Sequence, residues 1–384
     1  MSAKENTPSV ERVSNWGEAM ATATYRSGLL AMLQKVSRGW ELRKTAGNYR
    51  WLRAAGPRFA ILCYHRVGVE GVPLYSRLEP VAFEAQMRHL RRHYRVLSLG
   101  ALLSELERPA SAIPAVAVTF DDGYRDVYER AFPILQKYEI PATVFALAEA
   151  IETGTAPWYD RIFLALVSYP GAAITIELDT PKEFSLHSFA ARLAATDRIV
   201  RWLRDQTDER RRGFCRELNS RLPVPEEKLK NRMLTWEQLR IMQTGGVVCG
   251  SHTVSHPVLS RLDKQGQLRE LRDSRILLEQ RLACPVTDFA FPFGKAEDCS
   301  GVASLDLASC GYRSAVTTIN GFNRPGADPF ALRRVSIGEQ PHLALFAYQL
   351  NDLFLRAEEP GTAEAPQETP RIAHGRAVAP REGG

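Results

Sequence analysis

Short apolar runs alternate with amphipathic stretches along most of the chain. Small and β-branched apolar residues cluster in runs that suit strands buried on both faces of a parallel sheet. These runs cover residues 59–65, 115–121, 142–146, 247–252, 288–292, 314–319 and 330–337. Helical spacing of apolar residues predicts helices at 81–94, 124–139, 236–244, 264–282 and 300–309. The alternation predicts an α/β fold with a parallel sheet.

The alternation of apolar runs and amphipathic stretches stops between residues 151 and 234. The charged stretch 196–222 contains Trp202, Leu203, Phe214 and Leu218, a pattern that predicts amphipathic helices rather than disorder. We therefore predict one domain over residues 58–345 with a helical insertion at about 151–234. The insertion is either a lid over a binding groove or a helical cap on the side of the sheet.

Two adjacent carboxylates end one of the buried runs. Asp121 and Asp122 follow the run 115–120, and Gly123 after them permits a tight turn. Desolvation and mutual repulsion destabilise such a pair unless a cation or a donor lies near it. A polar turn with an aspartate N-cap is the structural alternative.

Two histidines end another buried run. His252 and His256 follow the run 247–250 within the sequence SHTVSHP, and their four-residue spacing places both on one face of a helical turn. Carboxyl ends of parallel strands meet at one edge of an α/β fold, where sites assemble. One carboxylate and two imidazoles suit a divalent metal with open coordination positions, which points to metal-assisted hydrolysis.

Three motifs, TFDDGY, His-Thr-x-x-His and FAFPFG, resemble those of the polysaccharide deacetylases with a NodB homology domain. The resemblance runs from about residue 59 to residue 340. It implies a distorted (β/α) barrel of about seven strands, and a metal-dependent hydrolase that removes acetyl groups from N-acetylated sugars. It also implies a divalent metal, foremost Zn²⁺, with Co²⁺ or Ni²⁺ as alternatives.

The resemblance assigns roles to individual residues. Asp121 would be the general base, and Asp122, His252 and His256 would hold the metal. The backbone N–H of Phe293 would stabilise the oxyanion, with Pro292 and Gly294 shaping the turn.

Two departures from the family pattern stand out. The third motif has Ala290 where many members carry an arginine that orients the base, so another group must hold Asp121. Arg125 is near in sequence, but nothing in the sequence selects it. The late Leu-x-His motif that supplies the general acid is also missing, because residues 330–337 read FALRRVSI.

An early histidine is the candidate substitute for the missing acid. His65 ends the run 59–63, and this resembles the biofilm poly-N-acetylglucosamine deacetylase branch, where an early Tyr-His segment replaces the late histidine. Tyr64 and Arg66 are weaker candidates for substrate contacts. Trp158 and Tyr159 either line a sugar platform or belong to the core.

Charge is concentrated before the first run. Residues 26–58 carry eight basic side chains and one acidic, a net +7, against +6 for the whole chain. Leucines and tryptophans interleave with these bases, so residues 1–57 include a basic amphipathic segment that either contacts an anionic membrane or packs on the fold. Residues 1–25 lack the apolar core of a secretory signal, which predicts a cytoplasmic location, with peripheral contact to the inner face of the membrane.

Other features narrow the range of partners. The basic residues elsewhere are balanced by acids and no nucleic-acid motif occurs, so we expect no nucleic-acid partner. The six cysteines show no CxxC spacing, which predicts neither a structural zinc site nor a disulfide framework. Residues 358–384 are rich in Pro, Gly, Ala and charge, a composition typical of a disordered tail.

The sequence thus favours a carbohydrate N-deacetylase of bacterial type, in exopolysaccharide or cell-surface glycan assembly, with an N-acetylated glycan as substrate. Three alternatives stay open: a carbohydrate O-acetyl esterase, an iron oxygenase with a two-histidine, one-carboxylate site, and a catalytically idle glycan-binding or membrane-assembly protein.

Overall fold

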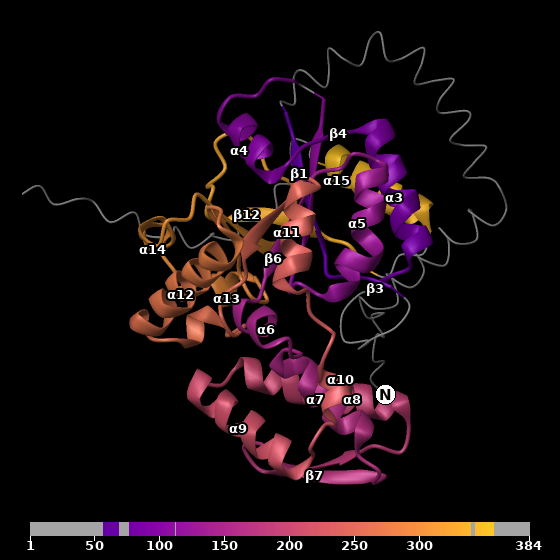
Figure 1. Ribbon diagram of the computed structural model, residues 1–384, viewed down its shortest axis with the longest axis vertical. Helices are drawn as coiled ribbons and strands as arrows, with labels where there is room; N and C mark the ends of the chain where they lie inside the picture. The colour runs from indigo at the N-terminus through magenta and orange to yellow at the C-terminus, as the bar shows by residue number, and fades with distance from the viewer. Residues whose placement is uncertain (1–56, 69–76, 112, 339–341, 357–384) are drawn as a thin grey trace, which may run out of the picture.

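The centre of the molecule is a closed barrel of parallel strands. The structure, a computed structural model, describes residues 57–68, 77–111, 113–338 and 342–356. Seven strands of these residues form the barrel, in chain order β1 (Phe59–Tyr64), β5 (Ala115–Phe120), β6 (Ala142–Ala146), β9 (Val247–Ser251), β10 (Asp288–Ala290), β11 (Ser314–Asn320) and β12 (Leu332–Ser336). Because β1 pairs with both β5 and β12, the sheet closes on itself (Figure 1). The predicted α/β barrel and its seven strands are confirmed.

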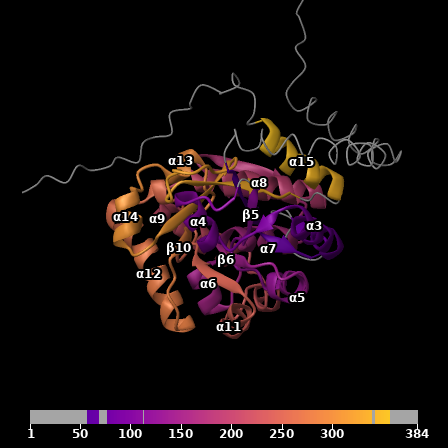
Figure 2. The same cartoon turned by 90° about the horizontal axis from the view of Figure 1, so that it is seen from above.

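Alternate side chains of each strand point into the barrel or out toward the helices. Phe59, Ile61, Ala115 and Ala117 point inward and share one apolar cluster with the helix α4 (Leu99–Glu107). This helix closes the barrel end where the strands begin, and Figure 2 shows it inside the outline of the surrounding helices. The opposite end, where the strands finish, carries the polar segments.

Three of the predicted helices form almost as expected: α3 (Pro80–His93), α11 (Trp236–Thr244) and α12 (Lys264–Leu282). Thr235 and Gln238 form a capping box that begins α11. The Asp263 side chain accepts a hydrogen bond from the Gly266 N–H at 2.6 Å and begins α12.

Two helices differ from the prediction. The helix expected from residue 124 begins at Arg125 but is irregular, with a π-helical turn (Val127–Ala131) before α5 (Phe132–Lys137). The preceding residues are held elsewhere, because Tyr124 forms an isolated bridge with Met233. The helix expected at 300–309 is divided into α13 (Ala296–Cys299) and α14 (Ser304–Ser309) by a turn in which Gly301 has a φ of +77°.

The insertion forms a lobe at the carboxyl end of the barrel strands (Figure 1). After α6 (Ala148–Thr153) it contains α7 (Trp158–Ser168), the hairpin β7 (Ala173–Glu177) and β8 (Pro181–Ser185), α8 (Phe189–Arg204), α9 (Asp208–Arg221) and α10 (Glu226–Leu229). The helices predicted over 196–222 are confirmed, but the hairpin was missed. The position of the lobe, over the strand ends, favours the lid over a cap on the barrel side.

The two ends of the chain are largely outside the described residues. The proposed membrane-contacting segment 26–58 falls outside them except for its last two residues, and the tail 358–384 falls outside entirely. Arg58 itself is buried, with its guanidinium 5.7 Å from the centre of the Phe322 ring, so its charge does not face a membrane. No helix in the described ranges has the length and apolar character needed to span a bilayer.

Candidate metal centre and catalytic residues

The predicted site residues come together at the carboxyl end of the barrel. Asp121 and Asp122 follow β5, His252 follows β9, and Phe293 lies just beyond β10. Asp122, His256 and Phe293 have positive φ values of 70°, 56° and 59°, which non-glycine residues rarely adopt. Such unfavourable conformations persist where the surrounding structure enforces them, and they often mark functional sites.

Three of these side chains have the geometry of a metal site. The Nε2 atoms of His252 and His256 each lie 3.6 Å from Asp122 Oδ1. In a tetrahedral zinc site with bonds of about 2.0–2.2 Å, neighbouring donor atoms lie about 3.4 Å apart. The cluster therefore needs little adjustment to hold a divalent metal, as the sequence predicted.

Burial shifts the pKa values of all three side chains. Burial lowers the pKa of both histidines, so their imidazoles are neutral and can act as ligands. Burial, followed by the adjacent Asp121 charge, raises the pKa of Asp122 well above its usual range. A bound cation would offset this penalty, so the residues present fit the metal that the sequence implies.

Neighbouring groups orient the candidate ligands. The Nδ1–H of His252 donates to the Ala290 carbonyl at 2.8 Å, which directs Nε2 toward the metal position. The hydroxyl of Tyr159, from α7, donates to Asp122 Oδ1 at 2.8 Å. Trp158, next to it, donates from Nε1 to the His256 carbonyl at 3.1 Å. The insertion therefore supports the metal-binding loop, and both aromatic residues are buried rather than exposed as a sugar platform.

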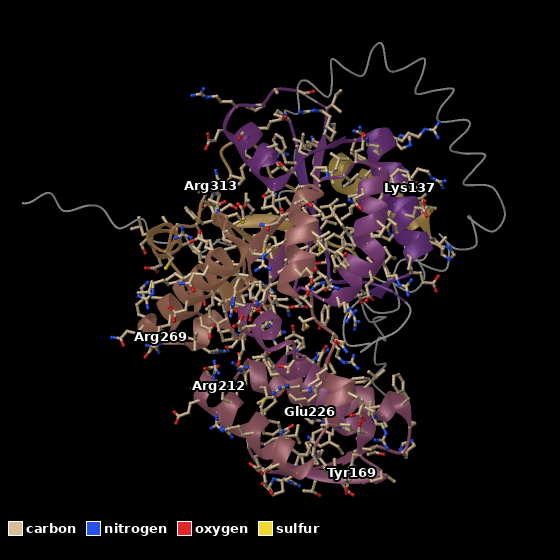
Figure 3. All side chains as sticks on the ribbon, in the orientation of Figure 1. Lys137, Tyr169, Arg212, Glu226, Arg269 and Arg313 are labelled. Atoms are coloured by element: carbon tan, nitrogen blue, oxygen red, sulfur yellow. The ribbon has the colours of Figure 1, made fainter. Side chains whose placement is uncertain are left out.

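Tyr159→Phe is expected to weaken metal binding by about 10- to 100-fold, because the donor that orients Asp122 is lost while the ring contact with His256 remains. Competition with a fluorescent chelator would measure the affinity. Tyr169→Phe, a tyrosine near the other end of the same lobe (Figure 3), is the control and should leave the affinity unchanged. Equal affinities for Tyr159→Phe and the wild type would remove the hydroxyl from the site.

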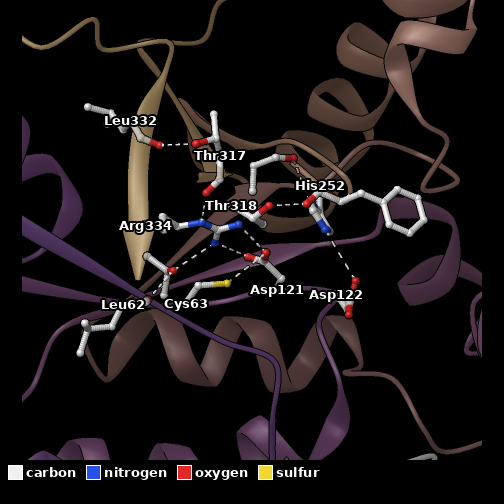
Figure 4. A network of polar contacts seen from close by, with 12 residues as sticks. Leu62, Cys63, Asp121, Asp122, His252, Thr317, Thr318, Leu332 and Arg334 are labelled. Carbon is white, nitrogen blue, oxygen red and sulfur yellow. Dashed lines mark hydrogen bonds and ion pairs between the residues drawn. The ribbon is translucent and has the colours of Figure 1, made fainter. Parts of the chain in front are cut away.

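A buried ion pair holds the predicted base. Nη1 and Nη2 of Arg334, on β12, donate to Asp121 Oδ1 and Oδ2 at 2.7 and 2.6 Å (Figure 4). The Arg334 Nε donates to the Thr317 carbonyl at 2.7 Å, which fixes the guanidinium plane. Burial alone would raise the pKa of Asp121, but the Arg334 charge, followed by His252, holds it well below its usual range. Asp121 is therefore a carboxylate at neutral pH.

Arg334 is the functional residue that the sequence analysis missed. The other candidate, Arg125, forms an ion pair with Glu129 on the π-helical turn and does not contact Asp121. Arg333 is exposed and Arg334 fully buried, so only the inward-facing arginine of the pair reaches the base. Strand alternation in LRRVS could have indicated a buried arginine, but not its partner.

His65 lies close to Asp121 but is not one of the three candidate metal ligands. A ring nitrogen of His65, the Sγ of Cys63 and a carboxylate oxygen of Asp121 all lie within 4.8 Å of one another. His65 is only partly buried, whereas its neighbours in the chain are buried. Burial lowers the pKa of His65 to about 4, although the Asp121 charge acts in the opposite direction. The imidazole is therefore neutral at pH 7.

Tyr64, suggested as a substrate contact, faces the other way. Because β1 alternates, Tyr64 points out of the barrel, and its hydroxyl donates to Gln86 Oε1 on α3 at 2.9 Å. Its ring packs against Phe83 and Phe120. Tyr64 therefore belongs to the core and not to the site, which corrects the sequence-based suggestion. Arg66 is likewise engaged elsewhere, in an ion pair with Asp126 at 2.8 Å.

The FPFG segment forms the predicted turn beside the metal ligands. Phe293 and Gly294 both have positive φ, and a Cβ at Gly294 would lie 2.7 Å from the Thr318 nitrogen. Pro292 accepts a hydrogen bond from the Gly294 N–H at 2.6 Å. The Phe293 ring packs on His256, with centroids 4.7 Å apart, and the Arg204 guanidinium covers it at 4.3 Å. Among the described backbone hydrogen bonds, none uses the Phe293 N–H.

Comparison with known proteins agrees with this arrangement. A family model described as polysaccharide deacetylase matches residues 109–315, over half of the chain. A putative polysaccharide deacetylase of Bacillus subtilis, YxkH, is 23% identical over 301 residues, which are 77% of each chain. The poly-β-1,6-N-acetyl-D-glucosamine N-deacetylase of Escherichia coli K12 is 32% identical over 99 residues, 25% of this chain and 15% of that one.

The fold is also found among solved structures. The Streptococcus pyogenes deacetylase PplD, determined in complex with acetate, superposes with a TM-score of 0.50 and 21% identity. The similarity covers 79% of this chain and 99% of that one. The matched segment includes both aspartates, both histidines and the FPFG turn. The chain belongs to the polysaccharide deacetylase family.

Proposed function

We propose that this protein is a metal-dependent carbohydrate N-deacetylase, which releases acetate from N-acetylated sugars of a polysaccharide or saccharide. One observation carries the proposal: three buried donors arranged for a metal lie directly beside an ionised carboxylate that is not one of them. A metal and an adjacent base together can activate water for the hydrolysis of an unactivated amide.

A divalent metal held by Asp122, His252 and His256 would act as a Lewis acid toward the attacking water and the acetyl carbonyl. Two imidazoles and one carboxylate suit zinc, and cobalt or nickel accept the same donors. We propose zinc as the native ion.

Asp121 is the proposed general base. It is ionised at neutral pH. Arg334 binds one lone pair of each oxygen and the Cys63 thiol donates to Oδ2, so the remaining lone pair of Oδ1 can accept a proton from the attacking water. The same ion pair lowers the basicity of Asp121. The two hydrogen bonds from Arg334 also fix the orientation of the carboxylate, and this fixed orientation offsets part of the loss of basicity.

His65 is the proposed proton donor to the leaving amine. Because its pKa is about 4, His65 is neutral at pH 7 and can deliver only a proton that reaches it during the reaction. Asp121, which has just accepted one from water, lies within 4.8 Å of it. In this scheme the proton passes from water through Asp121 and His65 to the nitrogen as the C–N bond breaks. The products are acetate and a free amine.

The oxyanion needs a donor on the opposite side of the carbonyl. The Phe293 N–H is the proposed donor, since the positive φ at Phe293 sets the direction of this peptide and His256 packs against its ring. The substrate is proposed to be a glycan containing N-acetylglucosamine, as in the name of the E. coli relative. The same attack would also cleave an O-acetyl ester, so the assay must distinguish the two.

Purified protein stripped of metal is expected to release no acetate from N-acetylglucosamine oligomers, and zinc, cobalt or nickel should restore release. Oligomers with β-1,6 and β-1,4 linkages and an O-acetylated glycan would be compared by enzymatic acetate assay. Release from the amide substrates supports the N-deacetylase, whereas release from the ester alone indicates an esterase.

Two variants accompany this assay. His252→Ala should lose both metal and activity, while His65→Ala should keep the metal and lose kcat, because His65 lies outside the ligand cluster. Stoichiometric metal binding with no release from any acetylated glycan would contradict the proposed function and favour a binding protein. Full kcat in His65→Ala would remove it from the proton pathway.

A further inference from the structure

A cavity of about 470 Å³ lies between the insertion lobe and the barrel. Its walls come from α6, α7 and α9, and from the loop that joins the two metal-binding histidines. Figure 3 shows Arg212 at this junction, where α9 faces the barrel. The cavity is large enough for a small organic molecule.

One wall of the cavity is made of guanidinium groups. Arg161, Arg211, Arg212 and Arg216 line it, and Glu149 is the one carboxylate among the lining residues. Arg161 and Arg216 have no ion-pair partner in the described part of the chain. Arg211 and Arg212 pair with Asp208, so the positive charge that the described residues leave without a partner comes from Arg161 and Arg216.

Arg211 is a further cation of this cavity with an incomplete set of hydrogen bonds. Its side chain is almost completely buried, yet its Nε has no hydrogen-bond partner among the described residues. Asp208 accepts hydrogen bonds from both Arg211 and Arg212, which fixes the two guanidinium groups in place. Buried donors are almost always satisfied, so this Nε marks a point at the cavity where the described residues leave a cation without its full set of acceptors.

Apolar side chains from the same two helices, α7 and α9, complete the lining of the cavity. Trp158, Ile162, Ala165 and Leu218 line it, and all four are buried against the lobe core. A site lined by both guanidinium groups and apolar side chains suits an anion attached to an organic group better than a free inorganic ion. Arginine forks bind the oxygens of phosphate in a bidentate manner, which makes a phosphate ester the favoured class.

The cavity is connected to the metal centre through the loop at its base. Arg212 donates to Ser255 Oγ at 2.8 Å, and Ser255 Oγ donates to Glu270 at 2.8 Å. Ser255 directly precedes His256, and Trp158 of the cavity wall donates to the His256 carbonyl. An occupant of the cavity would thus contact residues that hold a metal ligand.

We propose that this cavity binds the phosphate group of an organic phosphate, either on the substrate itself or as a separate ligand. The binding goes beyond the proposed function, because a neutral N-acetylglucosamine polymer has no group for the arginines. The deacetylated product is cationic and would be repelled by them. A phosphate ester on the glycan, or on a carrier attached to the glycan, would account for the arginines that line the cavity.

Binding is tested with glucose 1-phosphate, which has no acetyl group and so cannot be turned over. Calorimetric titration into the zinc-loaded protein should show saturable binding, and glucose should not bind. Arg161→Gln/Arg216→Gln should weaken binding at least about 10-fold, since each removes an unpaired cation from the wall. Arg210→Gln is the control, because Arg210 lies on the same helix but pairs with Asp179 outside the cavity.

The proposal would be overturned by any of three results: no saturable binding, equal binding by the wild type and the Arg161→Gln/Arg216→Gln variant, or the same loss of affinity in Arg210→Gln.

Acetate assays then identify the source of the phosphate. A KM at least about 10-fold lower for N-acetylglucosamine 1-phosphate than for N-acetylglucosamine places the phosphate on the substrate. A change in kcat on neutral oligomers when inorganic phosphate is added indicates a separate ligand. The titration needs no deacetylase activity, so it can fail or succeed independently of the proposed function.

Discussion

Asp121→Asn is expected to lower kcat for acetate release by about 10²- to 10⁴-fold while the protein still binds its metal. Asparagine keeps the shape of the side chain but cannot accept a proton from water at neutral pH. The ligands Asp122, His252 and His256 are unchanged by the substitution. The measurement is steady-state acetate release at saturating metal, together with metal content by elemental analysis.

The same substitution also leaves Arg334 buried without its carboxylate, so a loss of stability must be separated from a loss of chemistry. Asp126→Asn is a matched control, because it breaks the Arg66–Asp126 ion pair on the neighbouring turn and leaves the site intact. It should lower the melting temperature but keep kcat. Undiminished release by folded Asp121→Asn would show that Asp121 is not the base.

Arg334→Met is expected to lower the free energy of unfolding by about 3–5 kcal/mol at pH 7, because it leaves the Asp121 carboxylate buried and unpaired. The hydrogen bonds from Arg334 to the Thr317 carbonyl and to Thr119 Oγ1 are lost as well. Urea unfolding at several pH values measures the effect. Arg333→Met, at the exposed neighbouring position, should change stability by less than about 0.5 kcal/mol.

The sign of the pH dependence follows from the ion pair. In the wild type the pKa of Asp121 is depressed, so its contribution to stability is present above the unfolded pKa and is lost at lower pH. Without Arg334, burial dominates and raises the pKa of Asp121, so the variant loses stability as pH rises through that value. The difference in the free energy of unfolding between the wild type and Arg334→Met should therefore be largest near pH 7 and become smaller toward about pH 4.

A double-mutant cycle tests whether the two effects share one cause. Asp121→Asn/Arg334→Met removes both charges, so it should be more stable than the sum of the single variants implies, by about 0.5–3 kcal/mol. Additive losses would contradict a direct coupling between the two side chains and would assign the Arg334 effect to packing alone.

Local sequence pattern was enough to predict the barrel strands and to bring most of the candidate site residues together. Each strand is a local apolar run, and each candidate ligand follows the end of such a run, so the parallel arrangement alone brings Asp122 and His252 to one rim. The positions of Asp121, His65 and Phe293 follow from the same rule. The helices α11 and α12 could also be predicted from the sequence, because their capping residues and apolar spacing lie within the segments themselves.

Local pattern did not determine which way a residue at a strand end points. Tyr64 and His65 are adjacent, yet the alternation of β1 sends Tyr64 to the helices and leaves His65 near Asp121. The hairpin of the insertion was missed because its strands, β7 and β8, pair only with each other and are half exposed. Their short alternating pattern stands between two segments with a clearer helical spacing of apolar residues, α7 and α8.

The residues that support the candidate site come from segments far apart in the sequence. Arg334 and Asp121 are 213 positions apart, and they meet because β12 and β5 flank β1 in the closed barrel. Tyr159 reaches Asp122 only because the insertion folds back over the strand ends. Local propensity places a residue on a strand or a helix, whereas a contact between distant segments depends on barrel closure and strand register. Those in turn depend on how the whole core packs.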